Sequence, residues 1–115
     1  MVFLTWKRKL HRRKVRKMQL NPDRRILEDF CRRNHIRRLS FFGSVLREDF
    51  SDDSDVDVLV EFEPEAQVGL ITLAGLEIEL SRILDRRAEI HTPRGLNPHF
   101  RDEVLNLAEV QYEQA

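Results

Sequence analysis

Two apolar runs separated by a polar loop dominate the pattern of hydrophobic and polar positions. Residues 36–42 and 55–63 have the length and the β-branched and aromatic content of strands. In the second run apolar side chains recur at every second position, so they share one face of a strand. This alternation predicts that face to be buried and to consist of Val56, Val58, Val60 and Phe62. A third, shorter strand is predicted over residues 87–91, with Ala88 and Ile90 on one face and Arg87, Glu89 and His91 on the other.

Apolar spacing of three and four residues predicts helices around these strands. The first begins at Asn21-Pro22-Asp23, with Asn as the cap and Pro at the first helical position, and ends near Asn34. Its inward face is predicted to be Ile26, Leu27, Phe30 and Cys31. A short helix is expected over residues 45–50, within the polar loop.

Two longer helices follow the second strand. Residues 69–84 carry an apolar surface wider than one stripe, so this helix is either deeply buried or also meets a partner. The last helix begins at Asn97-Pro98, and its inward face is predicted to be Phe100, Val104, Leu107 and Ala108. The order is helix, strand, short helix, strand, helix, strand, helix. It predicts an α/β fold, a small mixed sheet backed by helices.

Charge divides the chain into two parts. Residues 1–20 hold eight Lys/Arg and no acid, whereas residues 21–115 hold twelve Lys/Arg and twenty Asp/Glu, a net charge of −8. The net charge of zero therefore hides an acidic domain with a basic N-terminal extension. We expect one domain over 21–115. The extension is either a nucleic-acid-binding arm, a solvated extension, or a segment upstream of a translation start at Met18.

The apolar residues Val2, Phe3 and Leu4 precede the basic run instead of following it, and they are too few for a secretory signal. The sequence contains no run of about 20 apolar residues such as a membrane span needs. The single Cys31 lies on an apolar helix face, which predicts a buried reduced thiol. These features favour a cytoplasmic protein.

The polar loop and the strand after it carry the candidate chemistry. Asp55 and Asp57 leave the same face of the predicted strand, and two adjacent carboxylates repel unless a cation lies between them. Mg²⁺ is the natural candidate, because it takes carboxylate oxygens together with substrate phosphates. Gly43-Ser44 permits close backbone approach to an anion, and Arg47 follows one turn later. Phosphate-binding and metal-binding groups together indicate nucleotidyl transfer.

Gly43-Ser44, ten residues, and then Asp55-Val56-Asp57 resembles the signature of the polymerase-beta-like nucleotidyltransferases. The short length and the forms of the segments 43–49 and 53–57 resemble the minimal branch of that superfamily, the MNT or MntA-type antitoxins, over about residues 22–110. The resemblance implies the minimal polymerase-beta-like fold. It also implies a third carboxylate after the long helix, where this chain has Glu89 and the family more often has Asp.

By the same resemblance, Asp55, Asp57 and Glu89 would bind two Mg²⁺ ions and carry catalysis, and Gly43, Ser44 and Arg47 would bind the nucleotide. The donor would be ATP, and the acceptor a tyrosine hydroxyl of a HEPN-domain toxin, which the added AMP inactivates. A heteromeric complex with that toxin is therefore expected, and a homo-oligomer through the helix at residues 70–84 is left open.

Three alternatives remain open at this point. The first is an antitoxin that neutralises its partner by binding alone. The second is a nucleic-acid-binding protein that acts through the basic extension. The third is a nucleotidyltransferase for small molecules such as aminoglycosides, although this chain has little room for an additional substrate-binding segment.

Overall fold

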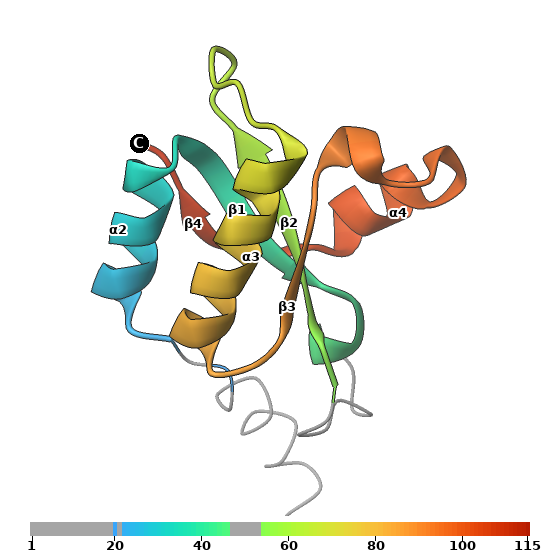
Figure 1. Ribbon diagram of the computed structural model, residues 1–115. Helices are drawn as coiled ribbons and strands as arrows, with labels where there is room; N and C mark the ends of the chain where they lie inside the picture. Colours follow the sequence, from blue (N-terminus) through green and yellow to red (C-terminus); the bar gives the residue numbers. More distant parts are fainter. Residues whose placement is uncertain (1–19, 21, 47–53) are drawn as a thin grey trace, which may run out of the picture.

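The computed structural model describes residue 20 and residues 22–46 and 54–115. An α/β fold is observed, as the sequence predicts (Figure 1). The helices and strands in chain order are α2 (Arg24–Arg33), β1 (Ile36–Phe42), β2 (Val56–Phe62), α3 (Leu70–Leu84), β3 (Ala88–His91), α4 (Pro98–Leu107) and β4 (Glu109–Glu113). Two 3₁₀ helices, η1 (Gly43–Leu46) and η2 (Pro93–Gly95), follow β1 and β3.

The strands form one mixed sheet in the order β3-β2-β1-β4. Strand β1 is antiparallel to both β2 and β4, whereas β2 and β3 are parallel. Parallel neighbours need a long crossover, and α3 provides it. Because of this crossover, the start of β3 lies beside the start of β2, where the predicted metal-binding residues are located.

The core lies between one face of the sheet and the helices α2 and α3, which lie side by side across it (Figure 1). Val56, Val58 and Val60 of β2 are buried there, as their alternation predicts. Phe62, the fourth residue of that set, is partly buried and packs against the same cluster. Leu20 also belongs to the core, so the folded part includes the last residue of the basic extension.

The first helix begins two residues later than the sequence suggested. Asp23, and not Asn21, is the N-cap, and its carboxylate accepts hydrogen bonds from the backbone N–H groups of Arg25 and Ile26. The predicted end at Asn34 is correct. Leu27, Phe30 and Cys31 are buried as expected, but Ile26 is exposed, because the sheet contacts only a narrow stripe of this helix.

Helix α3 is buried on one side only. Leu76, Leu80 and Leu84 pack into the core, whereas Leu70 is 85% and Ile71 is 91% exposed. Of the two explanations for its wide apolar surface, deep burial on all sides is therefore wrong. The exposed residues at the N-terminal end of α3 form an apolar surface that another protein could cover.

Helix α4 begins as predicted, because the Asn97 side chain accepts a hydrogen bond from the backbone N–H of His99. Its predicted inward face is correct only for Val104 and Ala108, which are half-buried. No residue of α4 is buried, and Phe100 and Leu107 are exposed. The helix lies away from α2 and α3 (Figure 1), so the core does not cover its apolar side chains.

Strand β4 was not predicted. Its apolar residues Val110 and Tyr112 alternate correctly for a strand, but two positions at the end of a chain are a weak pattern. It forms because the edge of β1 opposite β2 is open to pairing, and Leu39 of β1 lies beside Tyr112. The observed sheet thus has four strands where the pattern predicted three.

The helix expected over residues 45–50 is also revised. The described part is a 3₁₀ helix that begins at Gly43, two residues earlier than predicted, so it includes Ser44. Residues 47–50 lie outside the described residues. Elsewhere, burial raises the pKa of the Cys31 thiol to about 12, with a smaller contribution from Glu28, and the thiol is free and buried as predicted. Among the described helices, none has the length and apolar content that a bilayer crossing needs.

Candidate metal and nucleotide site

The candidate site lies on the sheet face opposite the core. In a sheet, directly paired residues of neighbouring strands point to the same side. Phe42 of β1 pairs with Asp57 of β2, and Asp57 pairs with Glu89 of β3. The three side chains therefore form one row across three strands. Residues 55 and 91, two positions from Asp57 and Glu89, lie on the same face.

The row brings two of the three predicted carboxylates together with a histidine. His91 Nε2 lies 3.3 Å from an oxygen of Asp57 and 3.7 Å from an oxygen of Glu89. One ligand atom from each of Asp57, Glu89 and His91 falls within 4.8 Å of the other two. All three side chains are half-buried, so they are held by the sheet and remain open to a ligand.

Gly43 shapes the other side of Asp57. Its φ is +78°, a backbone conformation that residues with a Cβ rarely adopt. A Cβ at this position would lie 2.5 Å from Oδ2 of Asp57, so only glycine leaves room for the carboxylate. Asp57 therefore sits between the Gly43 backbone and the Glu89–His91 pair. The predicted phosphate-binding turn and the predicted metal ligand are in direct contact.

Ser44 lies in the same turn. Its hydroxyl donates a long hydrogen bond, 3.5 Å, to the backbone carbonyl of Asp55. This contact joins the turn after β1 to the residue just before β2. Arg47, the remaining predicted nucleotide-binding residue, lies outside the described residues.

Asp55 is positioned differently from the other two carboxylates. It precedes β2, and one of its oxygens lies 3.9 Å from Nε of Arg87. Both side chains are well exposed, so this ion pair is a weak one. Asp55 thus lies on the predicted face, two residues from Asp57, but it is outside the Asp57–Glu89–His91 group.

The donor set fits a divalent cation. At metal–ligand distances of about 2.1 Å, an octahedral ion holds its ligand atoms roughly 3.0 Å apart when adjacent and about 4.2 Å apart when opposite. The observed separations of 3.3 Å and 3.7 Å require only small side-chain movements to reach those values. Two carboxylates also supply the negative charge that such an ion needs.

A comparison with known families identifies the domain that carries this site. Residues 23–110 match the family model of the nucleotidyltransferase domain. The chain belongs to this family. The matched range contains all three predicted carboxylates and the Gly43-Ser44 turn. The protein is therefore a nucleotidyltransferase, as the sequence signature indicated.

Similar proteins agree with this assignment. A protein of Methanocaldococcus jannaschii named as a protein adenylyltransferase is 31% identical over 91 residues, which are 79% of this chain and 96% of the relative. A solved structure described as a minimal nucleotidyltransferase is 38% identical, with a TM-score of 0.61. The matched region includes 74% of this chain and 85% of the chain in that structure.

A crystal structure of a toxin–antitoxin with AMP-PNP shares the fold, with a TM-score of 0.65 over 80% of this chain and 74% of its own at 17% identity. The MntA–HepT toxin–antitoxin also shares it, with a TM-score of 0.58 over 79% of this chain and 70% of its own at 16% identity. These two comparisons support the minimal nucleotidyltransferase fold that the sequence predicted.

In this nucleotidyltransferase, sequence reasoning did not assign His91 to the site. The pattern placed it on the same face as Glu89, which was the available signal. Its proximity to Asp57 depends on the parallel pairing of β2 and β3, which sets Leu59 beside His91 and Asp57 beside Glu89. The ring is further oriented by an edge-to-face contact with Phe42, with ring centroids 5.2 Å apart.

Helix α3 fixes the strand that carries Glu89 and His91. Strand β3 is at the edge of the sheet, so the N–H groups on its outer side need partners. Ser81 Oγ accepts from the N–H of Ala88 at 2.9 Å, and a carboxylate oxygen of Glu77 accepts from the N–H of Ile90 at 2.7 Å. These two contacts position β3 along the helix and thereby hold Glu89 in line with Asp57.

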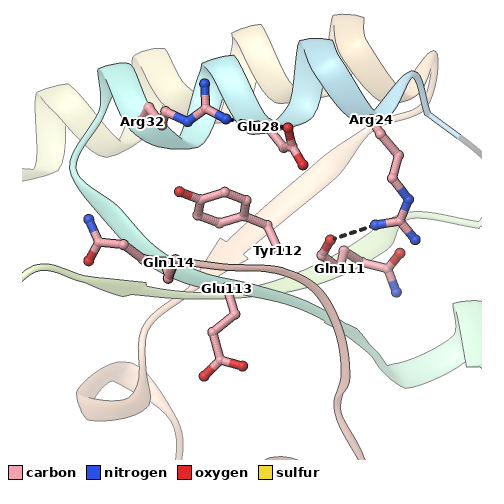
Figure 2. A pocket seen from close by; sticks show the side chains of 8 residues that line it. Arg24, Glu28, Arg32, Gln111, Tyr112, Glu113 and Gln114 are labelled. Carbon is pink, nitrogen blue, oxygen red and sulfur yellow. Dashed lines mark hydrogen bonds and ion pairs between the residues drawn. The ribbon is translucent and has the colours of Figure 1, made fainter.

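A separate hollow of about 560 Å³ lies between α2 and β4 (Figure 2), and β4 is at the opposite edge of the sheet from β3. Figure 2 shows the Tyr112 ring beneath α2 and Glu113 directed away from that helix. The two arginines here already have partners, because Arg24 donates to the carbonyl of Gln111 and Arg32 pairs with Glu28. The hollow therefore offers fewer unpaired charged groups for binding a ligand than the site around Asp57 does.

Proposed function

We propose that this nucleotidyltransferase is a Mg²⁺-dependent antitoxin that transfers AMP from ATP to a tyrosine hydroxyl of a HEPN-type toxin and so inactivates it. The observation that carries the proposal is the contact of Asp57 with both Gly43 and the Glu89–His91 pair, because it brings the turn predicted to bind phosphate against the group predicted to bind metal. The 31% identical relative named as a protein adenylyltransferase supports a protein as the acceptor.

Each residue has a role in this proposal. Asp55, Asp57 and Glu89 would hold the metal ions, which neutralise the triphosphate and lower the pKa of the acceptor hydroxyl. Gly43 and Ser44 would hold the terminal phosphates by close backbone approach and a hydroxyl contact, and Arg47 would add a positive charge. For Asp55 to join the site, its carboxylate has to leave Arg87, which costs little at so exposed a pair.

The reaction is a single displacement at phosphorus. The acceptor hydroxyl oxygen bonds to the α-phosphorus of ATP, and the bond from that phosphorus to the bridging oxygen of the β-phosphate breaks. Pyrophosphate leaves with that electron pair. Glu89, one methylene longer than the Asp more usual in the family, would take the proton of the hydroxyl. The pairing of β2 with β3 fixes the positions of Asp57 and Glu89 relative to each other. The protein therefore contributes to the reaction mainly by orienting the reacting groups.

A partner protein is supported by the exposed apolar residues at the start of α3, Leu70 and Ile71. Proteins of the same fold occur in toxin–antitoxin crystal structures, one of them with the ATP analogue AMP-PNP. These observations also favour the second candidate, an antitoxin that acts by binding alone, since an apolar contact surface serves both functions.

The test is transfer of labelled AMP from ATP, with Mg²⁺, to the product of the neighbouring gene, which the proposal expects to be the toxin. We expect label on the toxin, and none with an Asp55→Asn/Asp57→Asn double variant. A toxin that is silenced without label by both proteins would replace the catalytic proposal with the binding-only one. Label on the toxin from the double variant would remove these two carboxylates from the mechanism.

A further inference from the structure

We propose that His91 is a ligand of the metal bound by Asp57 and Glu89, and that it gives the site higher affinity for transition-metal ions than for Mg²⁺. The inference rests on the proposed metal-dependent function and assigns it an additional residue. It starts from the position of the imidazole, whose Nε2 approaches an oxygen of each carboxylate, at 3.3 Å and 3.7 Å.

The ring is held in that position from several sides. Phe42 contacts it edge to face at the end of β1, and the pairing of β3 with β2 fixes its Cα opposite Leu59. Glu77 holds the N–H of the preceding residue, Ile90, from α3. A side chain restrained by its neighbours loses less conformational freedom on binding a ligand, which favours its participation in a site.

Asp57 is packed closely against the turn after β1, because Gly43 leaves space for its Oδ2 where any other residue would place a Cβ. The Asp57 oxygen nearest His91 is Oδ1, the other atom of the same carboxylate. One oxygen therefore faces the turn that would hold phosphate, and the other faces the imidazole. His91 Nε2 lies 3.3 Å from Oδ1 and 3.7 Å from an oxygen of Glu89, and both separations fall in the range of about 3.0–4.2 Å that the ligand atoms of one octahedral ion span.

The chemistry of the donor atoms predicts the metal preference. Sites made of carboxylate oxygens alone suit Mg²⁺, Ca²⁺ and Mn²⁺, whereas an imidazole nitrogen suits divalent transition-metal ions that follow Mn²⁺ in the first row. Affinity for a mixed nitrogen and oxygen site rises from Mn²⁺ to Co²⁺ in the general series. A site with one imidazole and two carboxylates is therefore expected to bind Co²⁺ more tightly than Mg²⁺, while still admitting Mg²⁺ through its oxygens.

The experiment measures metal binding directly by calorimetry on the full chain, with Co²⁺ and with Mg²⁺. Three variants are compared with the unchanged protein: His91→Gln, Asp57→Asn, and His99→Gln as a control on an exposed histidine of α4. We expect His91→Gln to lower Co²⁺ affinity roughly tenfold or more and to change Mg²⁺ affinity less than threefold, by the usual size of effects at metal sites. The visible absorption of bound Co²⁺ should also shift when the nitrogen ligand is lost.

The outcomes separate this inference from the proposed function. If Asp57→Asn abolishes binding of both ions while His91→Gln changes neither affinity nor the Co²⁺ spectrum, His91 is only a structural partner of the carboxylates and the inference is wrong. An equal loss of both ions in His91→Gln overturns the predicted preference. If Asp57→Asn leaves both affinities unchanged, the metal site itself, and with it the proposed function, is wrong.

Discussion

The two faces of strand β2 differ in composition although they alternate along the same seven residues. Val56, Val58 and Val60 face the helices and are completely buried. Asp57, between two of them in the chain, is half-buried on the opposite face beside Glu89 and His91. Because successive side chains of a strand point in opposite directions, adjacent residues can serve stability and chemistry separately. Substitutions at neighbouring positions should therefore have different consequences.

The largest effect is expected from Asp57→Asn on nucleotidyl transfer. Loss of a metal-binding carboxylate should lower the transfer rate at least about 10³-fold, or about 4 kcal/mol. The free energy of unfolding should change by less than about 0.5 kcal/mol, because the side chain is not in the core. Rate assays and urea denaturation of the same preparation check both values, and a large loss of stability would contradict the separation of the two faces.

The neighbouring substitution Val58→Ala should do the opposite. Val58 is completely buried, so removing two methyl groups should lower the free energy of unfolding by about 2–3 kcal/mol. Transfer by the fraction that remains folded should stay within about twofold of normal. Denaturation curves and assays well below the unfolding midpoint measure this. A transfer defect as large as that of Asp57→Asn would mean that the core face also shapes the site.

Gly43→Ala should affect both properties, because Gly43 lies at the junction between backbone and site. The positive φ should cost about 1–2 kcal/mol of stability, and the new Cβ would displace the Asp57 carboxylate. Metal affinity should fall as well. Gly75→Ala is the matched control, since a Cβ there meets no atom within 4 Å and Ala favours a helix by up to about 1 kcal/mol. Equal effects of the two substitutions would rule out the contact with Asp57.

At neutral pH the smallest effect concerns Cys31, because its contribution changes only at alkaline pH. Burial raises the thiol pKa from 9.0 to about 12, so the folded state favours the neutral thiol. The resulting stabilisation is fully present below pH 9.0 and is lost as pH rises toward about 12. Stability of the unchanged protein should therefore decline more steeply over this range than that of Cys31→Ala. A thiol reagent that labels the native protein rapidly at pH 8 would contradict the burial of Cys31.

The strands with a long alternating or apolar pattern were predictable, because their burial depends on few other elements. Strand β2 and the cap of α4 at Asn97 follow from local sequence alone. Strand β4 and the exposed side of α4 do not, since one depends on the open edge of β1 and the other on how much of the core surface was already covered. The local sequence pattern shows which face of a helix or strand is apolar, but it does not show which other element packs against that face.

The same distinction applies to the site. The sequence by itself determined the Gly43-Ser44 turn, the common face of Asp55 and Asp57, and the place of Glu89 in the next strand, because spacing within a strand fixes the side on which residues project. Only the tertiary structure decided that Asp55 faces Arg87, that Gly43 makes room for the Asp57 carboxylate, and that His91 joins Asp57 and Glu89. Those contacts depend on the register of β3 against β2, and that register is set by the crossover through α3 and its side-chain contacts with the edge strand.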